Sequence, residues 1–119
     1  MTGIGESAFY NCRDLKKVNI PDGVTDIGPS AFSWCFALEN IVIPDGIHEI
    51  ADAVFTRSGL KEATVPAGVE SFGDSSFSHC KKLETIHFMG SKAQWDEIKK
   101  DKDWNKKSNA GMKIEYTTG

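Results

Sequence analysis

The stretch IGPSAFSWCFALENIVIPDGIHE, residues 27–49, is the fullest copy of a unit that recurs along the chain. The preceding stretch, IGESAFYNCRDLKKVNIPDGVTD, residues 4–26, has the same apolar framework 23 residues earlier. Successive copies open at Ile4, Ile27, Ile50 and Phe72, and the third is one residue short. Periods of about 20 to 29 residues are typical of solenoids, in which a repeat buries its apolar face only by stacking on its neighbours.

Apolar columns appear when the copies are laid in register. Each copy has one phenylalanine in the same phase, at Phe9, Phe32, Phe55 and Phe77, which predicts a stacked column of rings in the core. A leucine column follows. Then come two apolar residues spaced two apart, which predicts one short strand per repeat. These pairs are Val18 and Ile20, Ile41 and Ile43, Ala63 and Val65, and Ile86 and Phe88.

Punctuating residues divide each copy into the same segments. Proline ends the first three predicted strands, at Pro21, Pro44 and Pro66, and a glycine two residues later, at Gly23, Gly46 and Gly68, is expected in a turn that uses positive φ. A second short extended segment should follow. An acid or proline then stands after the opening residues, which favours one helical turn per repeat.

The pattern I-G-x-x-A-F-x-x-C-x-x-L-x-x-V/I-x-I-P-x-x-V/I, repeated from Ile4 to Phe88, resembles the BspA-like class of leucine-rich repeats. The resemblance implies an α/β repeat: a right-handed solenoid with a parallel sheet of one short strand per repeat and short helical turns opposite. It also implies frequent occurrence on the surface of anaerobic bacteria and mucosal protists, as adhesins or uncharacterised proteins.

The residues after Met89 depart from the repeat. Gly90 and Ser91 are suited to cap a helix over residues 92–100, with Trp95 and Ile98 on one face, and residues 113–116 alternate like a terminal strand. We therefore expect leucine-rich repeats over 1–89 and a C-terminal helix-strand cap over 90–119. Trp95 is interpreted as a core residue in preference to a binding anchor.

Composition limits the possible functions. The 119 residues carry a net charge of −3, and the segment 1–89 holds 7 basic and 12 acidic residues, which argues against a nucleic-acid partner. No apolar run is long enough for membrane insertion, and the N-terminus lacks the layout of a signal peptide. Cell-surface or secreted localisation is expected from the resemblance alone.

Cysteine and histidine residues do not form a reactive pattern. Cys12, Cys35 and Cys80 follow the repeat spacing, so we expect three buried free thiols and no metal site. His79 is adjacent to Cys80, but neighbouring side chains project apart and no third group orients them. We therefore expect no catalytic residues, no cofactor and no enzymatic activity.

The outward face of the predicted sheet is the candidate site for a partner. Side chains that alternate with the buried strand positions form two columns of varied, mostly polar residues: Lys17, Asn40, Glu62 and Thr85, and Asn19, Val42, Thr64 and His87. Simple solubility explains these residues as well as recognition does. Tyr10, Trp34 and Phe36 form a second candidate on the opposite side.

The expected function is a non-catalytic module that binds a protein or glycan partner through the sheet face. The alternative is a purely structural fragment that caps a longer surface solenoid at its C-terminus. The first repeat lacks a preceding strand in this sequence, so we also expect either a truncated solenoid or a homodimer joined through that repeat edge.

Overall fold

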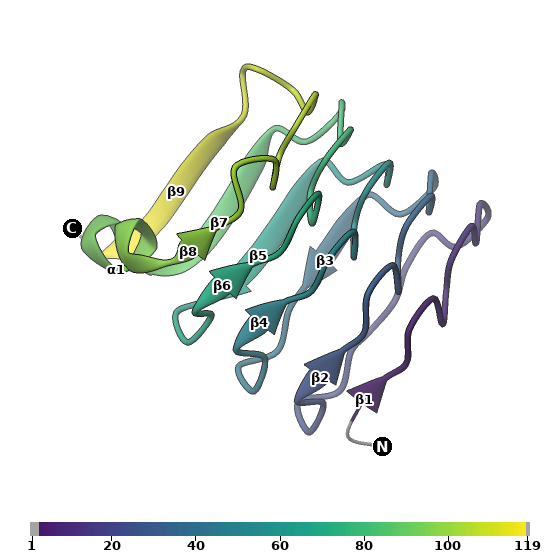
Figure 1. Cartoon of the computed structure of the whole chain (residues 1–119), viewed down its shortest axis with the longest axis horizontal. Coiled ribbons are helices and arrows are strands. Elements are labelled where there is room, and N and C mark those ends of the chain that lie inside the picture. Colours follow the sequence, from purple (N-terminus) through teal and green to yellow (C-terminus); the bar gives the residue numbers. More distant parts are fainter. Residues whose placement is uncertain (1–2, 119) are drawn as a thin grey trace.

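The computed structural model describes residues 3–118, which form a curved stack of rungs whose strands make three parallel sheets (Figure 1). The larger sheet has the order β3 (Asn40–Val42), β5 (Glu62–Pro66), β7 (Thr85–Ser91) and β9 (Lys113–Thr118). Opposite it, β1 (Gly3–Ile4) pairs with β2 (Asp26–Ile27), and β4 (Glu49–Ile50), β6 (Ser71–Phe72) and β8 (Lys99–Lys100) form a second ladder. These parallel ladders confirm the expected α/β solenoid.

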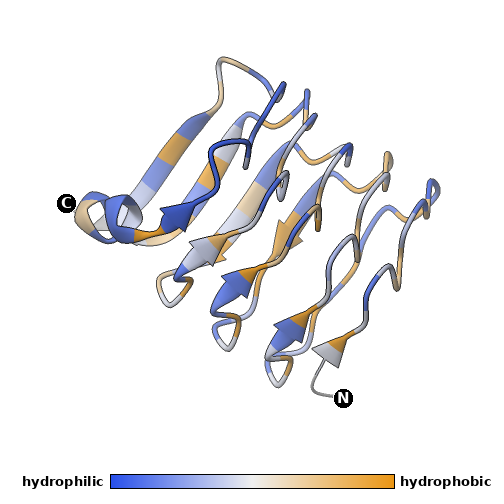
Figure 2. Cartoon of the chain, viewed as in Figure 1, coloured by the Kyte–Doolittle hydropathy of each residue, from blue (hydrophilic) through white to orange (hydrophobic). Residues whose placement is uncertain are grey.

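The predicted strand per repeat is present in the second, third and fourth copies. Ile41, Ala63 and Ile86 are in register and buried, while their neighbours along each strand point away from the core. The same alternation continues in β9, as the banding of Figure 2 shows. The prediction was wrong for the first copy, because residues 15–20 form no strand. Val18 in that segment is only half-buried.

The phenylalanine column is confirmed as the centre of the core. Ring centroids of Phe9, Phe32, Phe55 and Phe77 are separated in turn by 5.2, 5.7 and 5.1 Å, and all three pairs are stacked. Phe32, Phe55 and Phe77 are fully buried, whereas Phe9 at the end of the column is half-buried. The column therefore runs through the four repeats without interruption.

Consecutive tight turns replace the expected helical turns. In the first repeat, Ala8 N–H donates to the Gly5 carbonyl, whereas the next N–H, that of Phe9, donates to Ala31 of the following rung at 2.8 Å. This alternation recurs along the stack. A helix would direct all its N–H groups along its own axis, so it would leave the neighbouring rung's carbonyls unpaired.

The left-handed backbone positions lie in these turns and not at the glycines. No described glycine has positive φ, so the expectation for Gly23, Gly46 and Gly68 was wrong. Val24 N–H donates to the Pro21 carbonyl at 3.1 Å in a turn that needs no left-handed residue. Glycine is instead required at Gly28, where a β-carbon would overlap the Glu6 backbone.

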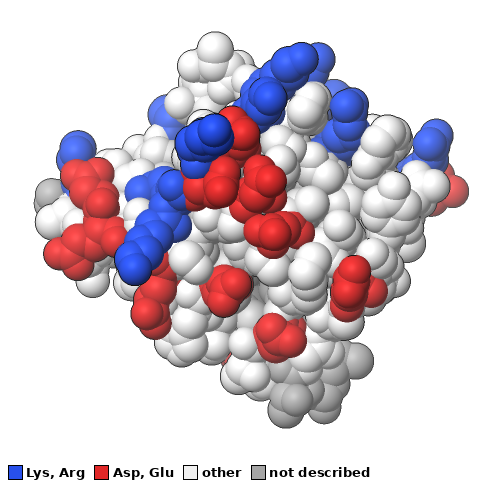
Figure 3. All heavy atoms as spheres, viewed as in Figure 1, with Lys and Arg blue, Asp and Glu red and all other residues white. Residues whose placement is uncertain are grey.

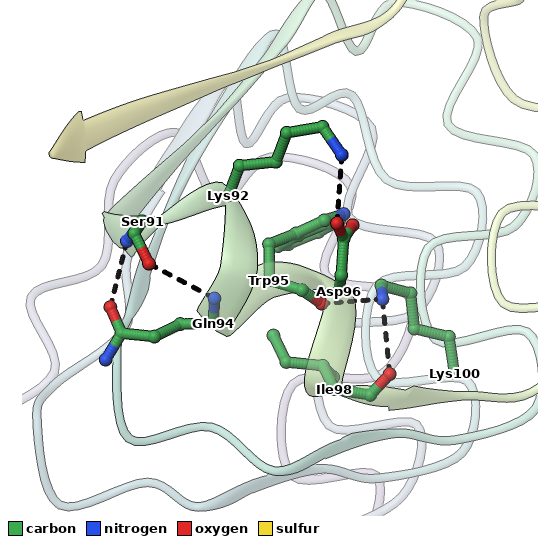
Figure 4. A network of polar contacts seen from close by, with 7 residues as sticks. All are labelled: Ser91, Lys92, Gln94, Trp95, Asp96, Ile98 and Lys100. Atoms are coloured by element: carbon green, nitrogen blue, oxygen red, sulfur yellow. Dashed lines mark hydrogen bonds and ion pairs between the residues drawn. The ribbon is translucent and has the colours of Figure 1, made fainter. Parts of the chain in front are cut away.

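The helix α1 (Lys92–Glu97) is shorter than the predicted span of 92–100 but is capped as predicted. Gln94 N–H donates to Ser91 Oγ at 3.2 Å, and Ser91 N–H donates to Gln94 Oε1 at 2.9 Å (Figure 4). Ile98 is extended, and the Lys100 ammonium donates to the Trp95 carbonyl at 2.8 Å, closing the helix end. In the described part of the chain, no helix is long and apolar enough to cross a membrane.

The segment after α1 forms a fifth rung. β8 and β9 extend the two ladders, and the turns between them accept the same cross-rung bonds, from Phe77 N–H to Trp104 and from His79 N–H to Lys106. The Ser108 hydroxyl donates to the Phe77 carbonyl, as the Cys80 thiol does to Phe55 one rung earlier. The boundary at residue 90 stays a prediction, but the backbone pattern of the repeat continues beyond it.

Trp95 lies in the core, as predicted. It is 7% exposed, and its ring contacts Phe72 at 5.4 Å, Phe88 at 5.4 Å and Trp104 at 5.9 Å between centroids. The Lys100 ammonium lies 4.8 Å from its ring centroid, and burial lowers the pKa of that lysine. The helix therefore covers the apolar end of the fourth repeat.

Candidate functional site

The larger sheet brings most of the predicted surface residues into two columns. Asn40 is in register with Glu62 and Thr85, and Val42 with Thr64 and His87. Lys17 and Asn19 are exposed as expected, but they lie in the first repeat, where no strand forms. The backbone register thus confirms the columns over three repeats.

Three members of the columns are less accessible than expected. Thr85 is only 6% exposed, so the prediction that it is accessible on the outward face was wrong. It is flanked in register by the longer side chains of Glu62 and Lys113. Thr64 and His87 are half-buried. The surface available to a partner is therefore smaller than the sequence indicates.

Ion pairs occupy the C-terminal half of this face. His87 Nε2 lies 2.6 Å from Glu62 Oε1, and His87 Nδ1 lies 3.1 Å from Glu115 Oε1. Lys113 pairs with Glu115 at 3.3 Å. Sequence reasoning missed Lys113 and Glu115, because the pairing of β9 with β7 joins segments that the repeat period does not relate. Side chains paired in this way offer fewer free groups to a partner.

The N-terminal half of the face differs in shape and in pairing. A depression of about 580 Å³ lies between the first two repeats. Its lining residues include Lys17, Asn19, Asn40 and Val42. Val42 is an exposed apolar side chain, with 60% of its surface accessible, and Lys17 has no ion-pair partner among the described residues. Half of the predicted site residues therefore line one hollow that includes an exposed valine.

Two of the three aromatic residues predicted on the opposite side, Trp34 and Phe36, form a cluster with the two arginines. Trp34 and Phe36 meet edge to face at 5.7 Å. The Arg57 guanidinium lies 5.0 Å from the Trp34 ring centroid, and that of Arg13 lies 5.3 Å from Phe36. Tyr10 is 51% exposed. The arginines were not singled out from the sequence, although Arg57 occupies the same repeat phase as Trp34, and Arg13 the same phase as Phe36.

The thiols are free, and two of the three are fully buried. Cys35 Sγ donates to the Phe9 carbonyl at 3.2 Å and Cys80 Sγ to the Phe55 carbonyl at 3.1 Å, and burial raises the pKa of both thiols to about 11. Cys12 is only half-buried, which corrects the expectation of three buried thiols. These contacts give the thiols a structural role.

His79 and Cys80 do not form a catalytic pair. The thiol of Cys80 points into the core, toward the Phe55 carbonyl, whereas His79 is half-exposed and its backbone is left-handed, with φ at 56°. Burial, and then the positive charge of Arg57 and nearby lysines, lowers the pKa of His79. The two side chains therefore lie on different faces of the rung, one buried and one partly exposed.

Three carboxylates that the sequence does not relate also converge. Ligand atoms of Asp74, Asp101 and Asp103 lie within 4.8 Å of one another. Asp101 already accepts the Asp103 N–H at 3.0 Å, and Asp74 accepts the Ser75 hydroxyl at 3.2 Å. Such bonds are common within turns, and the cluster has no further feature of a metal site.

An apolar depression of about 420 Å³ opens on the first rung. Phe9, Val18 and Ile20 contribute to its lining. The expected homodimer through this edge stays a prediction. Light scattering of the chain and of Val18→Lys at tens of micromolar tests it, and a monomer in both samples would contradict it.

Comparison with known proteins places the chain among bacterial repeat proteins. The model of the BspA type leucine rich repeat region matches residues 1–100 in six copies, more than the four indicated by the spacing. No curated protein matches the chain.

Several solved structures share the fold. A leucine rich cell surface protein from Faecalibacterium prausnitzii is 30% identical, with a TM-score of 0.66, over 84% of this chain and 33% of its own. The Treponema pallidum leucine rich repeat protein is 27% identical, with a TM-score of 0.66, over 74% of this chain and 45% of its own. A leucine-rich repeat protein from Bacteroides ovatus is 31% identical, with a TM-score of 0.55, over 71% and 28%. The chain thus spans less than half the length of these proteins. The ladders, the phenylalanine column and the family match agree: the chain belongs to the BspA-type leucine-rich repeat family.

Proposed function

We propose that the chain is a non-catalytic module that binds a protein or glycan partner through the N-terminal half of its sheet face, at the bacterial cell surface or after secretion. The observation that carries the proposal is the depression lined by exposed Val42 together with Lys17, Asn19 and Asn40. An exposed apolar side chain within a polar rim has the anatomy of a recognition surface. The relative from Faecalibacterium prausnitzii is described as a cell surface protein, which supports the location.

The ion-paired, C-terminal half of the sheet face also supports a partner site in the N-terminal half. In this half, His87 pairs with both Glu62 and Glu115. The region therefore contributes solubility and contacts between rungs. The hollow on the N-terminal side is less fully paired: Glu39 in its lining pairs with Lys61, but Lys17 has no ion-pair partner among the described residues. A partner that fills it gains about 1 to 2 kcal/mol from burial of the exposed part of Val42 alone.

A binding screen with matched variants tests this proposal. The isolated chain is applied to immobilised extracellular-matrix proteins and glycans, followed by Val42→Ser and, as a control on the same face, Thr117→Ala in β9. We expect Val42→Ser to weaken the strongest interaction about tenfold, since loss of a buried valine contact is worth about one to two kcal/mol. Thr117→Ala should bind as the parent does.

Two outcomes would contradict the proposal. If the chain binds none of the probes, the purely structural role in a longer solenoid becomes the better account. If Val42→Ser and Thr117→Ala both bind the probe as tightly as the parent chain does, the sheet face is not the recognition surface. A pH-rate profile of hydrolytic activity is a separate check on the absence of catalysis.

A further inference from the structure

The one-residue shortening of the third repeat produces a notch in the turn edge of the solenoid. Only Gly59 stands between Ser58 and Leu60, at the place where the second repeat has Phe36 and Ala37 and the fourth has two lysines. A depression of about 270 Å³ opens there. Its lining residues are Phe36, Arg57, Ser58, Gly59, His79, Lys81 and Lys82.

Positive charge is concentrated at this notch, and no ion pair with a described carboxylate offsets it. Among residues 3–118, no carboxylate forms an ion pair with Arg57, Lys81 or Lys82. The lowered pKa of His79, which arises first from burial and then from the positive charge of Arg57, Lys107, Lys81 and Lys106, is consistent with this crowding. We call the group the basic edge: Arg13, Arg57, His79, Lys81, Lys82, Lys106 and Lys107.

The basic edge is separated from most of the acidic groups. In Figure 3 one row of lysine and arginine side chains follows the upper edge of the visible face, with most acidic side chains below it, and a second basic group lies left of centre among acidic side chains. The chain as a whole carries a net charge of −3. A local positive field on an acidic protein steers small anionic groups to one place on the surface.

Aromatic rings hold both arginines of the chain in place at this edge. Arg57 lies over Trp34 at 5.0 Å, and Arg13 lies over Phe36 at 5.3 Å with its Nε donating to Asn11 at 2.8 Å. A guanidinium stacked on a ring keeps most of its N–H donors free. Phe36 remains 42% exposed beside them. The edge therefore offers pre-positioned cationic donors next to an open aromatic surface.

Backbone geometry adds a second reason to assign a role to these side chains. Trp34, Arg57 and His79 occupy equivalent left-handed positions, with φ of 63°, 58° and 56°. The first repeat has Asn11 there, a residue type that tolerates this region well. The cross-rung bond at this position uses only the backbone N–H, so the fold itself does not require a tryptophan, an arginine or a histidine.

We propose that the basic edge binds a sulfated sugar chain, with one sulfated ring seated in the notch. Sulfate oxygens accept charge-assisted hydrogen bonds from Arg57, Lys81 and Lys82, and the C–H face of the sugar packs on Phe36. The notch has room for a single ring-sized group. This surface is separate from the depression around Val42, and the proposal is independent of the function proposed above.

Titration with heparin at low and moderate salt tests the proposal. The probes are heparin, chemically desulfated heparin, hyaluronan and a single-stranded DNA oligonucleotide. The variants are Lys81→Gln/Lys82→Gln, Arg57→Gln and Phe36→Ala, with Lys92→Gln/Lys99→Gln as a control that removes the same charge from α1 and β8. Circular dichroism confirms that each variant is folded.

We expect the chain to bind heparin and to bind the desulfated polymer and hyaluronan at least about tenfold more weakly. Lys81→Gln/Lys82→Gln should weaken heparin binding about tenfold and reduce its salt dependence, whereas the control double variant should change it less than about twofold. Phe36→Ala should weaken binding about threefold at unchanged charge. Val42→Ser should leave heparin binding unchanged.

Three results would overturn the proposal. One is the absence of heparin binding at low salt. Another is an equal loss of affinity in the control double variant, which would indicate diffuse attraction. The third is DNA binding as tight as heparin binding and equally sensitive to Lys81→Gln/Lys82→Gln, which would show that the edge recognises any polyanion.

Discussion

The first and second repeats carry equivalent residues at equivalent positions, but only the second buries them completely. Phe32 is fully buried, whereas Phe9 is half-buried, and the same contrast separates Cys35 from Cys12. The segment 15–20 forms no strand, while residues 40–42 pair in β3. An apolar residue in a repeat is therefore buried by the rungs on both of its sides and not by its own rung.

The largest difference between the two repeats should appear when their phenylalanines are truncated. We expect Phe32→Ala to reduce the free energy of unfolding by about 3 to 5 kcal/mol, because it leaves a cavity between two stacked rings. Phe9→Ala should reduce it by only about 1 to 2 kcal/mol, since that ring is already half-exposed. Urea unfolding followed by circular dichroism measures both, and equal losses would refute the comparison.

The reactivity of the thiols should differ between the two repeats in the same way as the burial of the phenylalanines. At pH 8 an aromatic disulfide reagent should modify half-buried Cys12 at least about tenfold faster than Cys35 and Cys80, whose pKa of about 11 keeps them protonated. After denaturation all three thiols should react. Mass spectrometry of the partly labelled chain identifies the site, and preferential labelling of Cys35 would contradict the burial pattern.

The raised pKa values also predict how stability depends on pH. Burial of a neutral thiol stabilises the fold fully below the ordinary pKa of 9.0 and loses its effect as the pH rises through about 11. We expect stability to fall over this window, and to fall less in Cys35→Ala/Cys80→Ala. A thermal melt series from pH 8 to about 11 measures the change; parallel profiles for the two proteins would contradict the assignment.

Hydrogen exchange should show the absence of the first strand directly. Apart from Leu15, whose N–H bonds to Cys12, no amide in the segment 15–20 donates a backbone hydrogen bond within the described chain. Amides of β7, which pairs on both sides, should exchange at least about tenfold more slowly. Similar protection of the two segments would show that the first repeat forms its strand in solution.

The smallest effect concerns the residue that precedes each phenylalanine. Ser76 is fully buried, and its hydroxyl has no partner among the described residues, whereas the equivalent Ala31 is apolar and the equivalent Ala8 is exposed. Ser76→Ala should stabilise the chain by about 1 kcal/mol, because a buried unpaired hydroxyl is removed. Ala8→Ser should change stability by less than about 0.5 kcal/mol. Thermal melts resolve the two variants, and a loss of stability in Ser76→Ala would imply a hidden hydrogen bond.

Local pattern was sufficient for much of the architecture. The phenylalanine column, the strand positions from Ile41 onward, the cap at Ser91 and the core role of Trp95 were predicted from spacing and residue type. Each depends on periodicity or on neighbours within four residues, which a single sequence contains. The sheet-face columns were also predictable, because strand alternation has a period of two.

Tertiary structure decided the features that depend on contacts between rungs. The left-handed turns at Trp34 and Arg57 arise from backbone bonds to the next rung, so residue propensity pointed to the glycines instead. The fifth rung, with Ser108 in the position of a cysteine, follows α1, an insertion that hides its period. The pairing of His87 with Glu115 and the notch at Gly59 likewise require the stack itself. The sequence determined what each rung is made of, and the stacking of rungs decided which surfaces remain open, because burial and charge pairing are properties of neighbours in space.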